Sequence, residues 1–124
     1  MIRPRVLLAD DYPGFIAAIG RLLAQHCEVV GSVEDGARLL EEAARLQPDV
    51  IVLDLHMPAM NGIDACRELT RTLPRARIIV LTAEDDAVVR KVVLAAGASA
   101  FIEKQAVGTD LLPAVRNACG GQQL

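Results

Sequence analysis

Short apolar runs alternate with amphipathic helical patterns along this chain, and this alternation constrains its fold more than any other feature. The clearest run is Val50–Leu53, which lies within the segment Asp49–Pro58 and ends at Asp54. A run that is short, apolar and rich in β-branched residues predicts a strand buried on both faces. Four further strands are expected, at Val6–Ala9, Glu28–Gly31, Arg77–Thr82 and Ala100–Ile102.

Helical patterns separate these runs. Apolar spacings of three, four and seven predict helices over Pro13–Leu23, Asp35–Leu46, Ile63–Leu73, Glu84–Ala96 and Thr109–Cys119. In the fourth of these, Val88, Val92 and Ala95 lie on one face and are expected to be its apolar side. Pro113 is tolerated only in a first turn, so the last helix is expected to start late, near Thr109.

Five strands that alternate with five helices predict an α/β fold, a doubly wound parallel sheet with helices on both faces. The flavodoxin-like strand order 2-1-3-4-5 places the two most apolar strands, the first and third, in the middle of the sheet. The 124 residues are expected to form one domain.

Composition narrows the classes of function. The net charge of −3 argues against nucleic-acid binding by this segment, although a partner domain outside it could bind DNA. Cys27, Cys66 and Cys119 form no metal or redox motif, so reduced thiols in the cytosol are expected. Asp10 and Asp11 end the first apolar run too early for a signal peptide, and no stretch approaches the ~20 residues of a membrane span.

Functional groups follow four of the five expected strands. They are Asp10 with Asp11, Asp54, Thr82 and Lys104. Because parallel strands share one carboxyl edge, these side chains are expected to converge. Carboxylates ~4 Å apart repel by ~1–4 kcal/mol at surface-like dielectric, so the cluster needs a cation. An all-oxygen set suits Mg²⁺ or Mn²⁺.

This set of groups is suited to phosphoryl transfer, in which positioning and charge stabilisation supply most of the catalysis. Asp54 would attack the phosphoryl group. Asp11 and Asp54 would hold the metal directly, and Asp10 would hold it through water. Thr82 would donate a hydrogen bond to one phosphoryl oxygen, and Lys104 would pair with another.

Each residue also has an ordinary alternative role. Adjacent acids often lie in a solvated loop, Asp54 could be a turn residue, and Thr82 could cap the next helix. Lys104 could be a surface lysine and Phe101 a core residue. Their conjunction at four strand ends is what favours a functional site.

Four motifs carry a resemblance to a known family: LLADD at 7–11, VLDLHMPAMNG at 52–62, LTA at 81–83 and AFIEK at 100–104. With these motifs the chain resembles the receiver domains of two-component response regulators from Arg5 to Ala118. The resemblance implies a receiver domain over residues 1–119 and a tail or the start of a linker over 120–124.

The resemblance also implies roles. Asp54 is similar to the residue that accepts a phosphoryl group from a sensor histidine kinase, and Asp10 and Asp11 to the acidic pair that binds Mg²⁺ with it. The backbone carbonyl of His56 is similar to a third metal contact. Phosphate binding and switching are implied for Thr82, Ala83, Phe101 and Lys104.

The segments DDYPGF at 10–15 and LLPAVRNA at 111–118 resemble the NarL/FixJ-type subfamily, whose receivers precede a helix-turn-helix DNA-binding domain. The resemblance implies a cytoplasmic signalling switch rather than a classical enzyme, with a homodimer on phosphorylation. Two alternatives stay open. One is a haloacid-dehalogenase-type phosphatase, which normally carries an Asp-x-Asp pair where this chain has Asp10-Asp11. The other is a stand-alone receiver that only docks a partner.

Overall fold

A computed structural model describes residues 3–120, which contain a five-stranded sheet with the order β2-β1-β3-β4-β5. All neighbouring strands pair in parallel, so the predicted doubly wound topology is confirmed. The strands are β1 (Arg5–Ala9), β2 (Glu28–Val33), β3 (Val50–Asp54), β4 (Arg77–Thr82) and β5 (Ala100–Glu103). Of the expected tail, residues 121–124 lie outside the described part of the chain.

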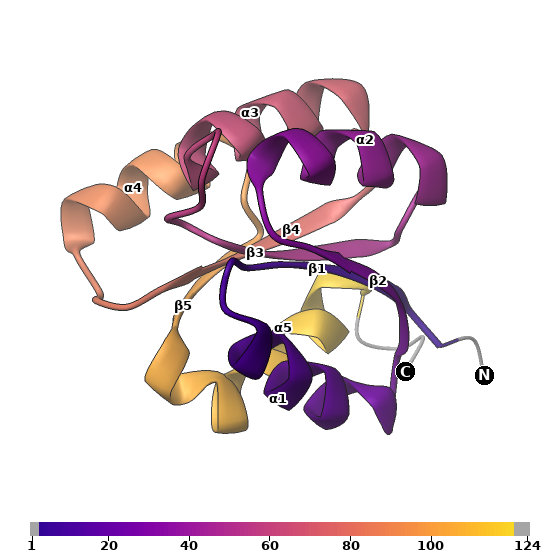
Figure 1. Ribbon diagram of the computed structural model, residues 1–124. Helices are drawn as coiled ribbons and strands as arrows, with labels where there is room; N and C mark the ends of the chain where they lie inside the picture. Colours follow the sequence, from indigo (N-terminus) through magenta and orange to yellow (C-terminus); the bar gives the residue numbers. More distant parts are fainter. Residues whose placement is uncertain (1–2, 121–124) are drawn as a thin grey trace.

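Helices cover both faces of the sheet (Figure 1). They are α1 (Pro13–Ala24), α2 (Gly36–Leu46), α3 (Gly62–Thr72), α4 (Ala87–Ala95), a 3₁₀ turn η1 (Lys104–Ala106) and α5 (Val107–Ala118). In the figure α2, α3 and α4 lie on one face, and α1 and α5 lie on the other. The predicted three-layer arrangement is therefore the observed one.

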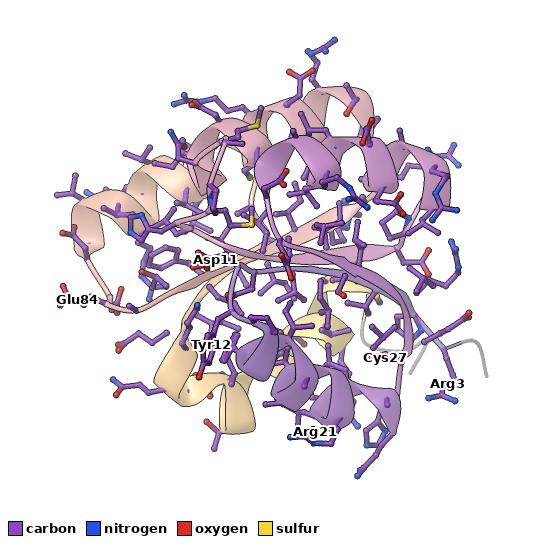
Figure 2. All side chains as sticks on the ribbon, in the orientation of Figure 1. Arg3, Asp11, Tyr12, Arg21, Cys27 and Glu84 are labelled. Carbon is purple, nitrogen blue, oxygen red and sulfur yellow. The ribbon has the colours of Figure 1, made fainter. Side chains whose placement is uncertain are left out.

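Successive residues of each inner strand enter opposite layers of the core, as the period of two in a β-strand requires. In β3, Ile51 and Leu53 pack in the layer under α2, α3 and α4, whereas Val50 and Val52 pack in the layer under α1 and α5. Side chains fill the space between the sheet and the helices on both faces (Figure 2). A strand buried on both sides explains why its sequence is continuously apolar.

The start of α4 differs from the prediction. The helix begins at Ala87, and Glu84 belongs to the preceding loop. The Asp86 carboxylate accepts hydrogen bonds from the backbone N–H groups of Val88 and Val89. This side-chain cap satisfies the first free N–H groups of the helix and so fixes where it begins.

The predicted apolar face of α4 is also wrong. Val88 is 72% exposed and Val92 37% exposed, whereas the neighbouring Val93 is fully buried. Apolar residues occur all around this short helix, so their spacing does not identify the side that packs on the sheet. The face that carries Val88 and Val92 points to solvent.

The predicted late start of α5 is wrong as well. The helix begins at Val107, directly after η1, and Pro113 lies inside it. A proline in a helix leaves the carbonyl four residues earlier, here that of Thr109, without its usual N–H partner. Thr109 and Pro113 are both exposed, so water can bond that carbonyl.

The three cysteine thiols are buried or half-buried. Cys27 and Cys66 are buried and Cys119 is half-buried, and burial raises the pKa of all three thiols. Such thiols carry little thiolate and react slowly.

Within residues 3–120, no helix combines the length and the apolar character that a membrane crossing requires.

Candidate functional site

Asp10 and Asp54 lie at the carboxyl ends of two neighbouring strands, β1 and β3. In the pairing of β1 with β3, Leu8 lies opposite Val52 and Ala9 lies opposite Leu53. Leu8 and Val52 face the layer under α1 and α5, so the period of two turns Asp10 and Asp54 to that same side. The register of two buried strands thus places these carboxylates next to each other at the carboxyl edge.

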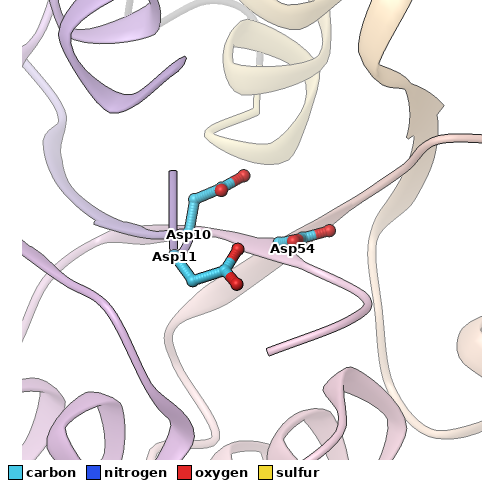
Figure 3. A group of neighbouring side chains, drawn as sticks. All are labelled: Asp10, Asp11 and Asp54. Carbon is cyan, nitrogen blue, oxygen red and sulfur yellow. The ribbon is translucent and has the colours of Figure 1, made fainter. Parts of the chain in front are cut away.

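Three carboxylates gather at this edge. One oxygen each from Asp10, Asp11 and Asp54 lies within 4.8 Å of the others. Figure 3 shows the side chains together, Asp10 and Asp11 from the end of β1 and Asp54 from the end of β3. Asp10 and Asp54 are buried, at 1% and 5% exposure, whereas Asp11 is exposed. The cluster is therefore open to solvent on the Asp11 side.

Backbone groups hold the two buried carboxylates. The N–H of Tyr12 donates to Oδ1 of Asp10 at 2.9 Å, and the N–H of His56 donates to Oδ1 of Asp54 at 3.4 Å. Each bond spans two residues and forms as the chain turns out of its strand. Pro13 begins α1 immediately afterwards, at a helical position where its missing N–H costs no hydrogen bond. The strand register thus places the two carboxylates, and these local bonds orient them.

Lys104 brings a positive charge into the cluster from the end of β5. Its Nζ lies 2.8 Å from Oδ2 of Asp10 and 3.4 Å from Oδ2 of Asp54. The side chain is 27% exposed, so the ammonium is partly desolvated. Burial alone would lower the pKa of Lys104, but its pairing with Asp10 and Asp54 outweighs burial and raises the pKa. The lysine therefore stays charged at neutral pH.

The pKa of Asp54 is raised above its ordinary value. Burial is the main cause, because it disfavours the charged carboxylate. Lys104 partly offsets this effect, and the nearby charge of Asp10 adds to it. Asp54 is thus a carboxylate held in a costly environment that further positive charge would relieve.

The donor set fits a hard divalent cation. Three carboxylates face one ammonium, so the site carries excess negative charge. Oδ2 of Asp10 is buried and receives no well-aligned hydrogen bond from the described residues, although Lys104 is close. Oxygen ligands on short acidic side chains are those that Mg²⁺ and Mn²⁺ prefer. The residues present therefore suit such an ion.

Thr82 lies at the same edge but on the other side of the sheet. Along β4, Thr82 follows Ile78 and Val80 at the period of two, so it lies on the same face of the sheet, the one covered by α4. On the neighbouring strand β5, Phe101 pairs with Val80 and lies on that face too. Its hydroxyl donates to the carbonyl of Glu84 at 2.9 Å and is buried. Among residues 3–120, no hydrogen bond joins this hydroxyl to a carboxylate of the cluster.

Phe101 is buried, with 5% of its surface exposed. The guanidinium of Arg90 on α4 lies 5.1 Å from the centre of its ring. Arg90 also pairs with Asp85 in the β4–α4 loop, N to O distance 3.0 Å. The aromatic ring is therefore covered by a cation whose partner belongs to the same loop as Glu84.

Sequence reasoning did not identify two residues next to this set. The ring of Phe15, on the first turn of α1, lies 4.7 Å from Nζ of Lys104, and Arg90 covers Phe101. Phe15 had a signal, because it is one of three aromatic residues and follows the acidic pair closely. No sequence signal pointed to Arg90, because the periodicity of a helix does not show which of its cations will contact an aromatic ring on a strand.

The other candidate residues lie as follows. His56 is exposed, and its backbone leaves β3 beside Asp54. Ala83 is exposed and follows Thr82 directly. A hollow of about 950 Å³ lies at the opposite edge, near Asp49 and Arg77, and none of the candidate residues lines it. The candidate site is thus a cluster of acidic side chains at the carboxyl edge of the sheet.

Comparison with known proteins finds many similar proteins, among them the following three. LiaR of Bacillus subtilis, a transcriptional regulatory protein, is 36% identical over 122 residues that cover 95% of this chain and 57% of LiaR. The signal receiver domain of NarL from Mycobacterium tuberculosis superposes with a TM-score of 0.90 at 30% identity, and the match covers 98% of this chain and 99% of that one.

The third is RcsB from Salmonella enterica serovar Typhimurium, solved bound to the rprA promoter in the presence of the phosphomimetic BeF₃⁻. Its TM-score is 0.84 at 31% identity, and the match covers 92% of this chain and 66% of RcsB. The chain spans about half the length of the curated relatives that it matches, 48% of one and 57% of another.

A family model also matches most of the chain. Residues 6–116 match the family described as the response regulator receiver domain. This range contains all five strands from Val6 onward, the acidic cluster and Lys104. The chain belongs to the family of response regulator receiver domains.

Proposed function

We propose that this chain is a phosphorylation-dependent signalling switch in which Asp54 accepts a phosphoryl group from a sensor histidine kinase. One observation carries the proposal: Asp54 ends a buried central strand, beside Lys104 and two further carboxylates. Membership of the receiver family supports this reading of the geometry. The rigid strand presents one carboxylate oxygen to a reagent that approaches the carboxyl edge.

The reaction is a transfer from phosphohistidine to carboxylate. An Oδ atom of Asp54 attacks phosphorus, an O–P bond forms and the P–N bond to the imidazole breaks. The imidazole keeps the electron pair and is left to take up a proton. Asp54 must be ionised to attack, and the ammonium of Lys104 favours that ionised form.

Asp10, Asp11, Asp54 and the backbone carbonyl of His56 would hold Mg²⁺ or Mn²⁺. When bound, the ion neutralises charge on the phosphoryl oxygens, which otherwise repels an anionic nucleophile. The chain's own contribution is to fix three carboxylates at one edge. The buried pair supplies rigid ligands, and the exposed Asp11 supplies the side from which an ion enters.

The phosphoryl oxygens recruit three groups after the transfer. The hydroxyl of Thr82 leaves the carbonyl of Glu84 and donates to one oxygen, with the N–H of Ala83 beside it. The ammonium of Lys104 pairs with another. Because Thr82 and Phe101 share one face of the sheet, moving Thr82 changes the space around Phe101 and the loop that leads into α4.

The relatives support a proposal for the downstream output. LiaR is a transcriptional regulatory protein and RcsB was solved on a promoter, so we assign this receiver the control of transcription through a helix-turn-helix domain. Residues 1–119 would form the receiver, and 120–124 would be a tail or the start of the linker. The domain would act in the cytoplasm and form a homodimer through α4, β5 and α5, where Val88 and Val92 are exposed. It would catalyse only its own phosphorylation and dephosphorylation.

Intact-mass spectrometry tests the switch directly. The protein is incubated with acetyl phosphate or phosphoramidate and Mg²⁺, and we expect one phosphoryl adduct that is absent from Asp54→Asn. Asp110→Asn, an exposed carboxylate on α5, is the matched control and should retain the adduct. Sustained release of phosphate from varied organic phosphates without an adduct would support a phosphatase. Neither adduct nor turnover would support a docking-only module.

A further inference from the structure

The ammonium of Lys104 has three close neighbours. Oδ2 of Asp10 lies at 2.8 Å, Oδ2 of Asp54 at 3.4 Å, and the ring of Phe15 has its centre 4.7 Å from Nζ. This last distance is within the range of a cation–π contact. The two carboxylates come from strand ends, whereas the ring comes from the first turn of a helix on one face of the sheet.

The fold holds Phe15 in place independently of Lys104. Its N–H donates to the carbonyl of Tyr12 at 3.1 Å, in the turn that starts α1 directly after the acidic pair. The side chain is half-buried and packs against the core layer under α1 and α5. The ring is therefore a fixed surface, whereas the lysine side chain is long and flexible.

We propose that Phe15 is a positioning residue for Lys104: its ring face keeps the ammonium beside the carboxylates of Asp10 and Asp54 before the phosphoryl group arrives. The inference rests on the proposed function of Asp54. Without the ring, the ammonium would meet water on that side and could leave the cluster. With it, Lys104 loses little freedom when it pairs with a phosphoryl oxygen, so positioning is supplied in advance.

The size of the effect follows from the strength of a cation–π contact. A partly desolvated contact of this kind accounts for roughly a 2- to 10-fold change in an equilibrium or a rate. The test variant is Phe15→Leu, which keeps an apolar side chain but removes the aromatic ring. Phe15→Tyr keeps the ring and is the conservative rescue. Ile16→Leu, a half-buried neighbour in the same core layer, is the matched control.

The first arm measures the rate of Asp54 phosphorylation by phosphoramidate at saturating Mg²⁺ in the 124-residue chain. We expect Phe15→Leu to slow the reaction roughly 2- to 10-fold, and Phe15→Tyr and Ile16→Leu to react at the parental rate. In a Lys104→Met background, Phe15→Leu should have no further effect, because no ammonium is left to position. Equal slowing in both backgrounds would overturn the proposal.

The second arm needs no phosphoryl donor. In the protein with Asp54 unmodified, NMR should find the ε-methylene protons of Lys104 shifted upfield by the ring current of Phe15, and the shift should vanish in Phe15→Leu but not in Ile16→Leu. Absence of this shift in the parent chain would overturn the positioning role. If the contact is present but no Asp54 adduct forms in any variant, the proposed function fails while the contact itself stands, and Phe15 then has no reaction to serve.

Discussion

Lys104 pairs more closely with Asp10 than with Asp54: Nζ is 2.8 Å from Oδ2 of Asp10 and 3.4 Å from Oδ2 of Asp54. Asp10 is the more deeply buried of the two carboxylates, and its Oδ2 has no well-aligned hydrogen bond from the described residues. In the unphosphorylated protein, the lysine therefore neutralises the most desolvated charge. It remains close enough to Asp54 to turn toward a phosphoryl oxygen.

This arrangement predicts a stability effect for Lys104→Met. Removing the ammonium leaves two buried carboxylates without a cation, which is more costly than losing a surface pair. Because Lys104 is 27% exposed, we expect a loss of about 1–3 kcal/mol in EDTA rather than the full penalty for a deeply buried pair.

Urea unfolding measures this loss, and Mg²⁺ should restore part of it because an ion can replace the missing charge. Lys91→Met, an exposed lysine on α4, is the control and should change stability by less than about 0.5 kcal/mol. If Lys104→Met and Lys91→Met behaved alike in EDTA, the lysine would not be compensating buried charge.

The raised pKa of Asp54 predicts the pH dependence of stability. Between the ordinary value of 3.8 and the raised value in the fold, the native state binds more protons than the unfolded state. The contribution of Asp54 to stability therefore falls as pH rises through this window and is constant above it. Asp54→Asn has no proton to lose, so its stability relative to the parent should rise over the same window.

Urea titrations of both proteins in EDTA between about pH 4 and pH 8 test this sign. The difference in the free energy of unfolding should grow in favour of Asp54→Asn and then level off. A difference that instead shrinks with rising pH would mean that the charge of Lys104 outweighs burial at Asp54. Asp64→Asn, an exposed carboxylate on α3, provides the reference for a change without burial.

The charge of Asp11 should lower the stability of the metal-free protein and strengthen its binding of Mg²⁺. It is exposed, and its carboxylate lies within 4.8 Å of the other two, so its charge repels theirs. We expect Asp11→Asn to stabilise the protein by about 0.5–1 kcal/mol in EDTA, and to weaken Mg²⁺ binding by at least about tenfold. Unfolding in EDTA and calorimetric titration with Mg²⁺ measure the two effects. Destabilisation in EDTA would contradict mutual repulsion among the three carboxylates.

The sequence was sufficient to predict the sheet because the relevant signals are local. Continuous apolar runs such as Val50–Leu53 identify strands buried on both faces, and the parallel topology then brings Asp10, Asp54 and Lys104 to one edge. No contact between distant residues has to be known for this step. The convergence of the acidic cluster and the lysine is a consequence of strand direction.

The elements that the sequence predicted poorly depend on tertiary packing or on a single cap. The side chain of Asp86, rather than the apolar pattern, sets the start of α4. In the same helix, Val92 is exposed and Val93 is buried, a choice made by the sheet beneath. The contact between Phe15 and Lys104 joins opposite ends of the chain, so no local pattern predicts it.

The loop that follows Asp54 contains a strained residue. Ala59 has φ = 73°, a left-handed conformation that glycine adopts without the steric cost of a Cβ atom. We expect Ala59→Gly to stabilise the protein by about 0.5–1 kcal/mol, since relief of strain exceeds the added entropy of the unfolded chain. Thermal and urea unfolding measure the change. Ala44→Gly, at an exposed helical position in α2, should destabilise by about 1 kcal/mol. Equal destabilisation by both substitutions would show that Ala59 carries no strain in solution.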